Sequence, residues 1–527
     1  MTTTAAPAQQ PVATARIPRT VRALIGLLAA TAAIGSGQLV AALVAPASAP
    51  FFAVADTVIR LSPPWLTEFG KSLGPVLDKL LLQVGVAVAV AAVAALAGIV
   101  SRRGPGPGLA IIGGLGLAGL AAVVAAPAFG LADLVAPIVA AAVGLAVFAL
   151  LHGLARTARA GRPTGAGVPR RALLIGASAA VGAVSLGAWT GGLLLAGGTG
   201  IEDSRRALTA RLAAARLTER APAIPDGAAF PELGTPTFLT PNPAFYRIDT
   251  ALRIPSTTAA AWRMRVHGMV ERELTLTVDD LLARPLVERT VTMTCVSNPV
   301  GGDLVSTANF VGVDLREIFL DAGVRPGADQ VFSTSLDGWY TGTPTDVVME
   351  PDRGAMLALG MNGEALPPEH GFPVRMLVPG LYGFVSATKW LADIELTTFG
   401  AKQGYWLERR WAQRAPIKTQ CRIDFPRGFA TVAAGRVMVA GIAWAQPSGI
   451  SRVEVRMDGS PWREATLSTE VNGRTWRMWK AEFDLSPGNH TVQTRATDMA
   501  GTTQPETRAE PIPDGASGWP ATIFTAA

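Results

Sequence analysis

Cysteine and histidine are scarce in this chain, whose 527 residues include 2 cysteines and 4 histidines. Two cysteines can form one disulfide at most. The long apolar segments contain a single histidine, His152. Because bis-histidine ligation of haem within one chain needs two histidines, we expect these segments to carry no haem of their own. The sequence also lacks a nucleic-acid-binding motif, so the net charge of +6 does not by itself indicate that the protein binds nucleic acid.

Charged residues are nearly absent from one part of the chain. Residues 21–197 consist of long runs of Ala, Val, Leu and Gly, whereas residues 200–527 contain both charge signs in the manner of a soluble protein. Five stretches are long and apolar enough to cross a bilayer as helices. They are Val21–Val44, Leu80–Val100, Gly108–Ala126, Leu131–Leu151 and Ala172–Ala196. The sequence therefore predicts a five-span α-helical membrane bundle followed by a large globular part.

The arginines between the apolar stretches predict the orientation. Arg16, Arg19 and Arg22 precede the first stretch, Arg102 and Arg103 follow the second, and Arg156, Arg159, Arg162, Arg170 and Arg171 follow the fourth. The alternate loops contain only Arg60, Lys71 and Lys79. Because positively charged loops stay in the cytoplasm, we expect a cytoplasmic N-terminus and an extracytoplasmic position for everything after Gly200 in the cell membrane.

Two features leave alternatives open. Ala47-Ser48-Ala49 resembles a signal-peptidase site, but the apolar run before it is longer than that of an ordinary signal peptide, which favours an uncleaved first span. Cleavage would leave four spans and the same outside placement. The pair Arg170–Arg171 directly before the last span is compatible both with the charge rule and with twin-arginine export of an already folded domain.

The remaining pattern predicts the domain order. We expect a cytoplasmic tail (residues 1–20), the membrane region (21–197), an extracytoplasmic linker rich in Pro, Gly and Ala (198–239), a domain over 240–400, a connector (401–434) and a last domain over 435–527. Strand-like and short helical runs alternate irregularly in the 240–400 region, which favours an α+β fold. Regularly spaced short strands after residue 435 favour an Ig-like β-sandwich.

Cys295 is the most informative residue of the globular part. It follows the alternating run Thr292-Met293-Thr294 and precedes a polar loop that ends in Gly301-Gly302. A thiol at the mouth of a strand could bind a soft metal ion, although a lone cysteine is more often a small buried apolar residue. A disulfide from Cys295 to Cys421 would remove such a ligand, so the disulfide and metal interpretations exclude each other. We favour an inert, unbridged Cys421.

Several separated motifs carry a family resemblance. They are Thr240–Arg247 (TPNPAFYR), the Cys295 segment, Met361–Arg375 (MNGEALPPEHGFPVR), Val378–Gly380 (VPG) and Lys389–Leu391 (KWL). In this order they resemble the sulfite oxidase family of molybdopterin oxidoreductases. The last domain, with Trp476–Trp479 (WRMW), resembles the C-terminal dimerisation domain of that family. The resemblance covers about half of the chain, from Thr240 to about Pro505.

The resemblance implies a molybdenum-molybdopterin cofactor and a set of site residues. Cys295 would be the thiolate ligand of molybdenum, and Tyr340 would lie beside the metal, where a phenol can donate a hydrogen bond or relay a proton. The cofactor's phosphate would be bound by His370, Arg375, Lys389 and Arg247. Tyr246, Asp249, Asn298, Ala387 and Thr388 would line the cofactor.

Departures from the family pattern bear on the substrate. The sulfite-oxidising members have one arginine shortly after the ligand cysteine, where this chain has Pro299 and Val300, and another upstream, where it has Ile248, or Asp249 in a shifted frame. A dianion held without those guanidinium groups would lack its strongest partners, so we expect a substrate other than sulfite. The segment Gly383–Lys389 is one residue longer than in plant-type relatives. The chain also lacks a cytochrome b5 type module, which implies a separate electron-transfer partner.

Three functional hypotheses follow. The leading one is a membrane-anchored molybdopterin oxidoreductase, with a homodimer among its options, that transfers an oxygen atom to or from a small extracytoplasmic substrate. Its electron partner would be a cytochrome, a quinone-linked protein or a haem-bearing membrane subunit. A more specific version is a reductase of methionine sulfoxide, another S-oxide or an N-oxide. The third hypothesis is a cofactor-free membrane receptor built on a degenerate enzyme fold, against which the joint presence of Cys295, His370, Arg375 and Lys389 argues.

Overall fold

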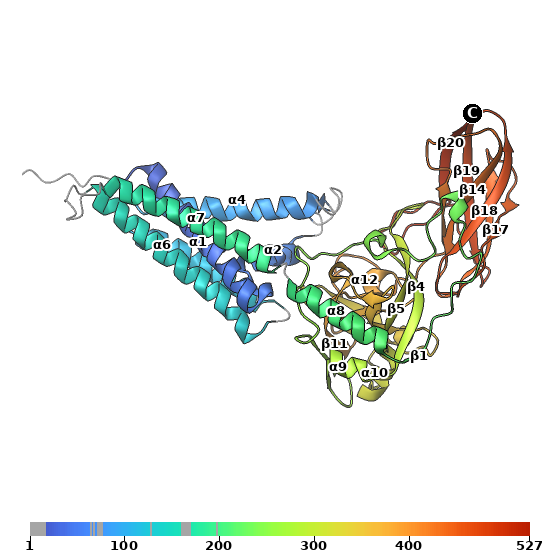
Figure 1. The fold of residues 1–527 in the computed structure, drawn as a ribbon, viewed down its shortest axis with the longest axis horizontal. Coiled ribbons are helices and arrows are strands. Elements are labelled where there is room, and N and C mark those ends of the chain that lie inside the picture. The colour runs from blue at the N-terminus through green and yellow to red at the C-terminus, as the bar shows by residue number, and fades with distance from the viewer. Residues whose placement is uncertain are drawn as a thin grey trace, which may run out of the picture. The chain divides into compact units, whose positions relative to one another are not determined.

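The computed structural model describes residues 17–63, 66, 69–70, 77–126, 129–159, 170–196 and 199–527. The chain divides into two compact units, Met1–Gly198 and Thr199–Ala527. The first unit is helical and the second contains all of the strands in the described part of the chain (Figure 1).

The first unit is built around its first helix. Its helices are α1 (Arg19–Val44), α2 (Pro50–Leu61), α4 (Leu77–Val100), α5 (Gly106–Val124), α6 (Val135–Arg159) and α7 (Arg170–Ala196), with short 3₁₀ turns η1 (Pro46–Ser48) and η2 (Leu131–Leu134). Helix α1 packs against α4, α6 and α7. A Cβ at Gly26 would lie 1.8 Å from the carbonyl oxygen of Ala94, and one at Gly98 would lie 1.8 Å from that of Arg22. Glycine at these two positions therefore lets α1 and α4 approach backbone to backbone.

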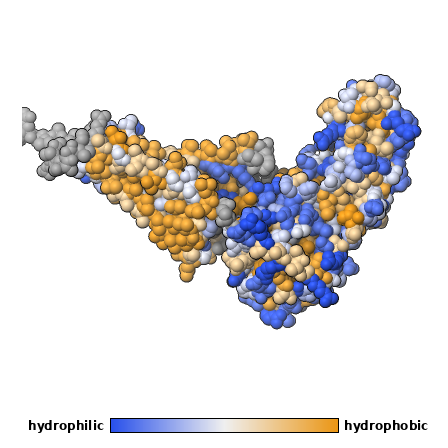
Figure 2. Space-filling model, in the orientation of Figure 1, coloured by the Kyte–Doolittle hydropathy of each residue, from blue (hydrophilic) through white to orange (hydrophobic). Residues whose placement is uncertain are grey.

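Five helices of this unit are long and apolar enough to cross a membrane. Four of the predicted stretches fall within them, and the third, Gly108–Ala126, runs two residues past the end of its helix at Val124. Helix α2, which has 12 residues and lies between the first two, was not predicted as a separate element. Large apolar side chains such as Leu80, Val88, Leu117 and Val184 are exposed, and the surface of the unit is hydrophobic over most of the visible face (Figure 2). An apolar exterior of this extent is what lipid-facing helices require.

The arginine-bearing ends of three helices meet at one end of this unit. The guanidinium group of Arg22, near the start of α1, donates a hydrogen bond to the carbonyl of Ile99 near the end of α4. His152 of α6 lies 3.0 Å from the carbonyl oxygen of Ser101, just after α4. Of the other residues used for the orientation, Arg16, Lys71 and Arg162 and the side chains of Arg159, Arg170 and Arg171 lie outside the described residues.

The second unit begins with an α+β region, as predicted. One mixed sheet has the order β1 (Leu217–Glu219), β4 (Leu286–Thr294), β5 (Val305–Asp314), β8 (Met356–Met361) and β10 (Arg375–Leu377), with β9 (Glu364–Ala365) paired to β8. The other has the order β3 (Leu274–Thr277), β2 (Arg263–Gly268), β11 (Leu391–Thr397), β6 (Gln330–Ser335) and β7 (Tyr340–Pro344). The helical elements are α8 (Thr199–Ala214), α9 (Val278–Leu282), α10 (Leu315–Ala322), α11 (Thr345–Val348) and α12 (Gly383–Ser386), with 3₁₀ turns η3 (Pro231–Leu233), η4 (Asn242–Ala244) and η5 (Pro368–His370).

Local sequence explains where the helices of this region begin and end. The Thr277 hydroxyl accepts a hydrogen bond from the amide of Asp280 at the start of α9, and the Asp280 carboxylate accepts one from the amide of Thr277. The Asp314 carboxylate accepts from two amides at the start of α10, which ends at Gly323 with φ +69°. These are N-cap and C-cap arrangements that satisfy the free backbone groups of short helices.

The last part of the chain is the predicted β-sandwich. One sheet contains β12 (Gln420–Phe425), β14 (Gly435–Trp444), β18 (Arg477–Leu485) and β17 (Thr466–Leu467). The other contains β13 (Thr431–Val432), β20 (Ala521–Ala526), β19 (Gly488–Asp498), β15 (Ile450–Met457) and β16 (Arg463–Glu464). Val439 and Trp479 of the first sheet share one core with Val453 and Phe524 of the second. Because β12 and β13 precede residue 435, the sandwich includes much of the predicted connector.

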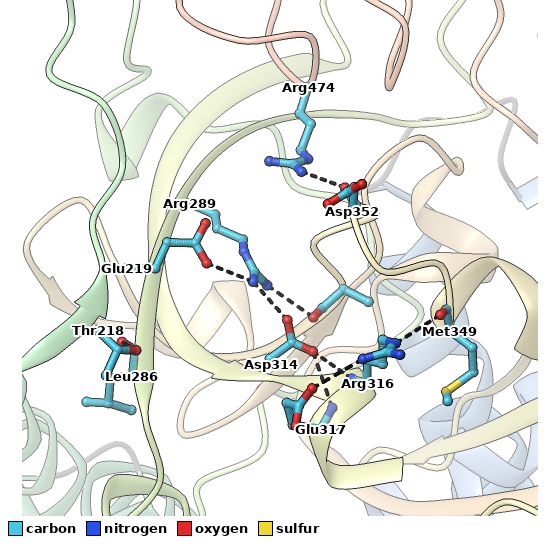
Figure 3. Close-up of polar contacts among 11 residues, drawn as sticks. Thr218, Glu219, Leu286, Arg289, Asp314, Arg316, Glu317, Met349, Asp352 and Arg474 are labelled. Atoms are coloured by element: carbon cyan, nitrogen blue, oxygen red, sulfur yellow. Dashed lines mark hydrogen bonds and ion pairs between the residues drawn. The ribbon is translucent and has the colours of Figure 1, made fainter. Parts of the chain in front are cut away.

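The predicted linker over residues 198–239 is wrong, because this segment is part of the folded unit. Leu208 of α8 is 1% exposed, and Phe230 and Phe238 are buried in the same core as the strands. Arg205 donates from Nε to the carbonyl of Leu366 at 3.0 Å. In Figure 3, Glu219 of β1 lies beside Arg289 of β4, with 3.2 Å between the charged atoms. Proline and glycine are typical of tethers, but apolar side chains between them anchor this segment to the core.

Replacing Leu208 by Ala is expected to lower the free energy of unfolding of the second unit by about 2–4 kcal/mol, because it removes buried apolar volume. The matched control is Arg206→Ala on the same helix, where an exposed side chain changes stability by about 0.5 kcal/mol or less. Denaturant unfolding of the full chain in detergent, followed by tryptophan fluorescence, measures both. If the two variants had the same free energy of unfolding, α8 would not be part of the folded core, and residues 198–239 would be a linker.

Candidate active site

Cys295 directly follows strand β4 and begins a tight loop. The amide of Cys295 donates to the carbonyl of Leu304 at 2.9 Å, and the amide of Asn298 donates to the carbonyl of Cys295 at 3.1 Å. The Asn298 side chain closes the loop, because its Oδ1 accepts from the amide of Leu304 at 2.9 Å. Cys295 is 9% exposed. Both cysteines are described, and no disulfide joins them.

Two polar atoms around this loop are buried and have no hydrogen-bond partner within the described residues. They are Oγ1 of Thr294, directly before Cys295, and Nδ2 of Asn298, directly after the turn. A buried polar group without a partner costs free energy comparable to a lost hydrogen bond. The loop therefore offers hydrogen-bonding capacity that a bound group could use.

A second set of side chains forms a buried basic cluster, made of Arg375, His370 and Lys389. Arg375 of β10 is 3% exposed and donates from Nη1 to the carbonyl of His370 at 3.2 Å, while its Nε has no partner in the described residues. His370 Nε2 lies 3.1 Å from the carbonyl oxygen of Asn242. Lys389 Nζ donates to the carbonyl of Glu369 at 3.0 Å and pairs with the Asp249 carboxylate at 3.2 Å.

Burial controls the charge of this basic cluster. Removal from water lowers the pKa of Arg375 to about 10. The same cause, with a contribution from the charge of Arg375, lowers the pKa of His370 to about 4. Burial also lowers the pKa of Lys389 to about 8, against the opposing effect of Asp249. At neutral pH the cluster contains neutral His370 and two buried cations beside one carboxylate, so it is suited to an anion.

The sequence around Gly371 explains why these basic groups converge. Gly371 ends the 3₁₀ turn η5 with φ +110°. A Cβ at this position would lie 3.1 Å from Cβ of Arg375 and 3.1 Å from Cα of Lys389. Trp390 fixes the other side, because its Nε1 donates to the carbonyl of Pro368 at 2.7 Å. Glycine thus supplies both the left-handed backbone and the space that the two cations need.

Tyr246 lies between the cysteine loop and the basic cluster. Burial raises its pKa, the charge of Cys295 adds to the rise, and the charge of Arg375 opposes it. A Cβ at Gly383 would lie 3.6 Å from Tyr246 Oη and 3.9 Å from the carbonyl oxygen of Thr294. The structure therefore brings together Cys295, Tyr246, Arg375 and the start of α12.

Four further predicted site residues differ in exposure and in hydrogen-bond partners. They are Asp249, Arg247, Ala387 and Thr388. Asp249 is buried and pairs with Arg247 at 2.8 Å, but the Arg247 side chain is 42% exposed. Ala387 is buried, and its amide donates to the carbonyl of Gly383 at 3.0 Å. The Thr388 hydroxyl lies 2.7 Å from that of Ser333 and is thereby engaged within the protein. Thr388 could therefore line a cofactor through its backbone more readily than through its side chain.

Tyr340 is placed differently from the other predicted residues. It begins β7, and its Oη donates to the Glu408 carboxylate at 3.0 Å. Burial, together with the charge of Glu408, raises its pKa to about 12. Among the described contacts, none connects Tyr340 to Cys295.

Tyr382 was not predicted, although its surroundings connect it to Cys295. It is 1% exposed and directly precedes Gly383 of α12. Burial raises its pKa, and the charges of Asp514 and Cys295 add to the rise. In the sequence it stands in Pro379-Gly380-Leu381-Tyr382-Gly383, where a tyrosine between apolar residues gives no signal of a site.

The β-sandwich contacts the cysteine loop through Arg422. Arg422 of β12 donates from Nη1 to the carbonyl of Gly302 at 3.3 Å and pairs with Asp424 at 2.6 Å. Cys421, on the same strand, is 1% exposed, and its thiol donates to the side chain of Gln504 at 3.0 Å. Burial raises the pKa of Cys421 to about 12, so its thiol is protonated and unreactive at neutral pH.

The donor set is unlike that of a metal site built by the protein alone. Within the described residues there is no group of three or more His, Cys, Asp or Glu side chains that could hold a metal ion. One thiol beside a buried basic cluster instead fits a metal that arrives with an anionic organic ligand. The unpartnered Thr294 Oγ1, Asn298 Nδ2 and Arg375 Nε are the polar atoms that such a ligand would satisfy.

Family models and known proteins with similar sequences agree with a site that binds an anionic organic cofactor. Residues 251–406 match the oxidoreductase molybdopterin binding domain, and residues 415–512 match the Mo-co oxidoreductase dimerisation domain. The chain is 31% identical over 327 residues to mitochondrial sulfite oxidase of Rattus norvegicus, which covers 53% of this chain and 59% of that protein. It is 28% identical over 334 residues to NADH nitrate reductase of Hordeum vulgare, which covers 51% of this chain and 36% of that protein.

The chain thus spans less than two thirds of the length of these relatives. Among solved structures it resembles the sulfane dehydrogenase SoxCD from Paracoccus pantotrophus, with a TM-score of 0.47 and 21% identity, over 55% of this chain and 84% of that chain. The family models, the sulfite oxidase relatives and the cysteine loop beside a basic cluster agree. This chain is a member of the sulfite oxidase family of molybdopterin oxidoreductases.

Proposed function

We propose that this protein is a membrane-anchored molybdopterin-dependent oxidoreductase that transfers an oxygen atom on a small extracytoplasmic substrate. The observation that carries the proposal is the pair Phe245 and Tyr246, which links the cysteine loop to the buried basic cluster. The Phe245 ring contacts the rings of Tyr246 and His370, and the surroundings of Tyr246 include the charges of both Cys295 and Arg375. Buried donors without a partner among the described residues lie in both places. A degenerate fold kept only for binding a partner would have no reason to keep two cations buried at a cost in desolvation.

Different residues would bind the metal, the phosphate and the polar edges of the cofactor. The Cys295 thiolate would bind the metal, Arg375 and Lys389 would neutralise the phosphate, and neutral His370 would add a hydrogen bond. When bound, the cofactor supplies a centre that changes its oxidation state by two electrons. Asn298 Nδ2 and Thr294 Oγ1 would contact its polar edges. Burial of the loop keeps bulk water away from the thiolate.

The reaction balances with water as the oxygen source. In the oxidising direction, substrate plus water gives oxygenated substrate, two protons and two electrons. The electrons pass to a separate acceptor, which we propose to be a cytochrome, a quinone-linked protein or a haem-bearing membrane subunit. In the reducing direction the same partner donates two electrons, two protons are taken up from solvent, and the oxygen leaves as water. The match to a dimerisation domain supports a homodimer.

The charges near the cysteine loop favour a neutral substrate over a dianion. The named relatives act on sulfite and nitrate, which are oxyanions, but residues 299 and 300 of this chain are Pro and Val. The guanidinium group that the described contacts bring to this loop belongs to Arg422, and Asp424 neutralises it at 2.6 Å. We therefore propose an S-oxide or N-oxide, methionine sulfoxide included, rather than sulfite.

The helical unit supports membrane anchoring with the enzyme outside the cytoplasm. Its five long apolar helices suffice for five crossings. The Arg-bearing ends of α1, α4 and α6 meet at one end, as the contacts of Arg22 and His152 indicate. If that end is cytoplasmic, an odd number of crossings places residues after Gly200 on the opposite side.

Purified protein from a host that makes molybdopterin is expected to contain about one molybdenum atom per chain, measured by elemental analysis. Cys295→Ser is expected to lower turnover by at least about 100-fold, because it removes the thiolate ligand. Cys421→Ser is the matched control and is expected to keep both metal and turnover. A metal-free parent protein would instead support the receptor hypothesis.

The basic cluster predicts a pH dependence of stability for the cofactor-free protein. The pKa of Lys389 is about 8 when folded and 10.5 in the reference state, so the unfolded chain binds more protons between these values. Stability is therefore expected to rise as pH increases from about 8 to 10, by at most about 1.4 kcal/mol per pH unit. The charged or titratable groups around Lys389 are Asp249, Arg375, Arg247, Asp337 and His370.

Chemical denaturation between pH 7.5 and 10 measures this rise. Lys389→Met is expected to remove it, and a bound cofactor phosphate is expected to suppress it, because an adjacent anion restores the charged lysine. The same slope in the cofactor-free parent and in Lys389→Met would contradict a lysine whose pKa is lowered by burial.

A dye-coupled turnover screen tests the substrate class. We expect kcat/KM for methionine sulfoxide or an N-oxide to exceed that for sulfite by at least about 10-fold, because the loop offers no unpaired guanidinium group among the described contacts. Val300→Arg is expected to raise the relative activity on sulfite, whereas Val300→Gln, which adds polarity without charge, is not. Preference of the parent protein for sulfite would refute this part of the proposal.

A further inference from the structure

Helix α8 lies outside the matched molybdopterin domain but contacts the segment that leads to the basic cluster. It begins at Thr199, whereas the family match begins at residue 251. The Thr209 hydroxyl of α8 accepts a hydrogen bond from the amide of Ala365 in β9 at 2.8 Å. Strand β9 is followed by η5, which ends at His370. Helix α8 is therefore placed to influence where His370 lies.

Arg205 of α8 uses its whole guanidinium group to hold this segment. Its Nε donates to the carbonyl of Leu366 at 3.0 Å, and its Nη2 donates to the carbonyl of Ala365 at 3.2 Å. Its Nη1 donates to the Glu202 carboxylate of the same helix at 2.9 Å, which orients the group. The Arg205 side chain is 14% exposed, and both carbonyl-bearing residues are buried. Because hydrogen bonds from a charged donor are among the stronger ones, these contacts fix the chain directly before η5.

A second connection from Arg205 to His370 passes through Glu364 and Asn242. Arg205 Nη2 lies 3.3 Å from one oxygen of the Glu364 carboxylate. The other oxygen accepts from Nδ2 of Asn242 at 2.6 Å, and the carbonyl oxygen of Asn242 lies 3.1 Å from His370 Nε2. Since the Glu364 side chain is 45% exposed, its ion pair with Arg205 contributes little stability by itself. What the pair does is orient the carboxylate that holds Asn242.

Asn242 fixes the segment that packs on His370. Besides Glu364, its Nδ2 contacts the carbonyl of Met361 at 3.3 Å, and its Oδ1 accepts from Nδ2 of Asn362 at 2.9 Å. The ring of Phe245, in the same segment, meets the His370 ring edge-on with 5.3 Å between centroids. A shift of Asn242 would therefore move both the carbonyl and the ring that hold His370.

We propose that Arg205 is a positioning residue for the site that binds the anionic end of the cofactor, and that it acts through these two connections to His370. This rests on the proposed function, because it takes the basic cluster to be the site of the cofactor phosphate. The described contacts of Arg205 are with residues 364–366 and Glu202, so it acts from outside the basic cluster. An arginine suits this role because its planar fork bonds several acceptors at once, which a lysine cannot do.

Inorganic phosphate, titrated calorimetrically into the cofactor-free full chain in detergent at pH 7, tests the positioning without relying on turnover. Arg205→Met is expected to weaken phosphate binding by about 5- to 10-fold, because the segment before His370 loses its charged donor. Arg206→Met is the matched control and is expected to keep the parent's affinity, since Arg206 lies on the same helix with an exposed side chain. Lys389→Met shows that the phosphate lies at the basic cluster if it also weakens binding.

A double-variant comparison tests the connection through Glu364. Glu364→Gln keeps an oxygen for Asn242 but removes the ion pair, and about a 2- to 3-fold loss of phosphate affinity is expected. If Arg205 acts partly through Glu364, the double variant loses less affinity than the product of the two single losses. Strictly independent losses would exclude this connection and leave only the one through the backbone.

Protein loaded with molybdenum separates positioning from a general loss of structure. Arg205→Met is expected to release its molybdenum faster than the parent, by about the same 5- to 10-fold factor, with kcat per bound molybdenum atom unchanged. A fall in kcat per molybdenum atom at parent-like phosphate affinity would indicate a structural defect and overturn the assignment. If Arg205→Met does not fold, Arg205→Lys decides, because it keeps the charge and loses the fork.

Parent-like phosphate affinity and molybdenum retention in the Arg205 variant would overturn the proposal, and so would an equal loss in Arg206→Met. In those cases the parent still binds both molybdenum and phosphate, so the proposed function stands. A parent protein that binds neither would instead count against the proposed function and overturn this assignment with it.

Discussion

Burial of Arg375 and Lys389 beside the Asp249 carboxylate is the constraint on which the site depends. Charges in such a position raise the free energy of the folded chain unless anions compensate them fully. Gly371 favours the arrangement, because its φ is +110° and a Cβ there would lie only 3.1 Å from Arg375 Cβ and from Lys389 Cα. Tyr246, whose surroundings include the charges of Cys295 and Arg375, links these cations to the cysteine loop.

The folded unit is larger than the matched domains, and its added parts stabilise the site. Helix α8 packs on the β8–β9 side of the first sheet through Leu208 and Arg205. From the other direction the sandwich reaches the cysteine loop through Arg422 and supports β4, where the side chain of Gln446 donates to the carbonyl of Thr292 at 2.9 Å. The loop that presents the thiol and the strand before it are therefore braced by the sandwich, which is distant from them in sequence.

Much of the local structure was predictable because it depends on neighbouring residues. The alternating run before Cys295 is strand β4, the Thr277–Asp280 pair begins a helix, and the regular short strands after residue 435 form a sandwich. The roles of His370, Arg375 and Lys389 stay predictions, although the structure brings these side chains together. Residues 198–239 were misjudged because composition does not reveal that Phe230 and Phe238 find a core to pack in.

The sequence by itself determined the division into an apolar helical unit and a strand-rich unit, because long apolar runs and ordered strand patterns are linear properties of a chain. Only the tertiary structure decided the surroundings of each tyrosine. Tyr340 and Tyr382 are equally plain in the sequence, but one donates to Glu408 and the other is buried against the backbone of Gly515. Such a difference arises from residues far apart in the chain, Lys418 and Gly515 among them, that meet only on folding.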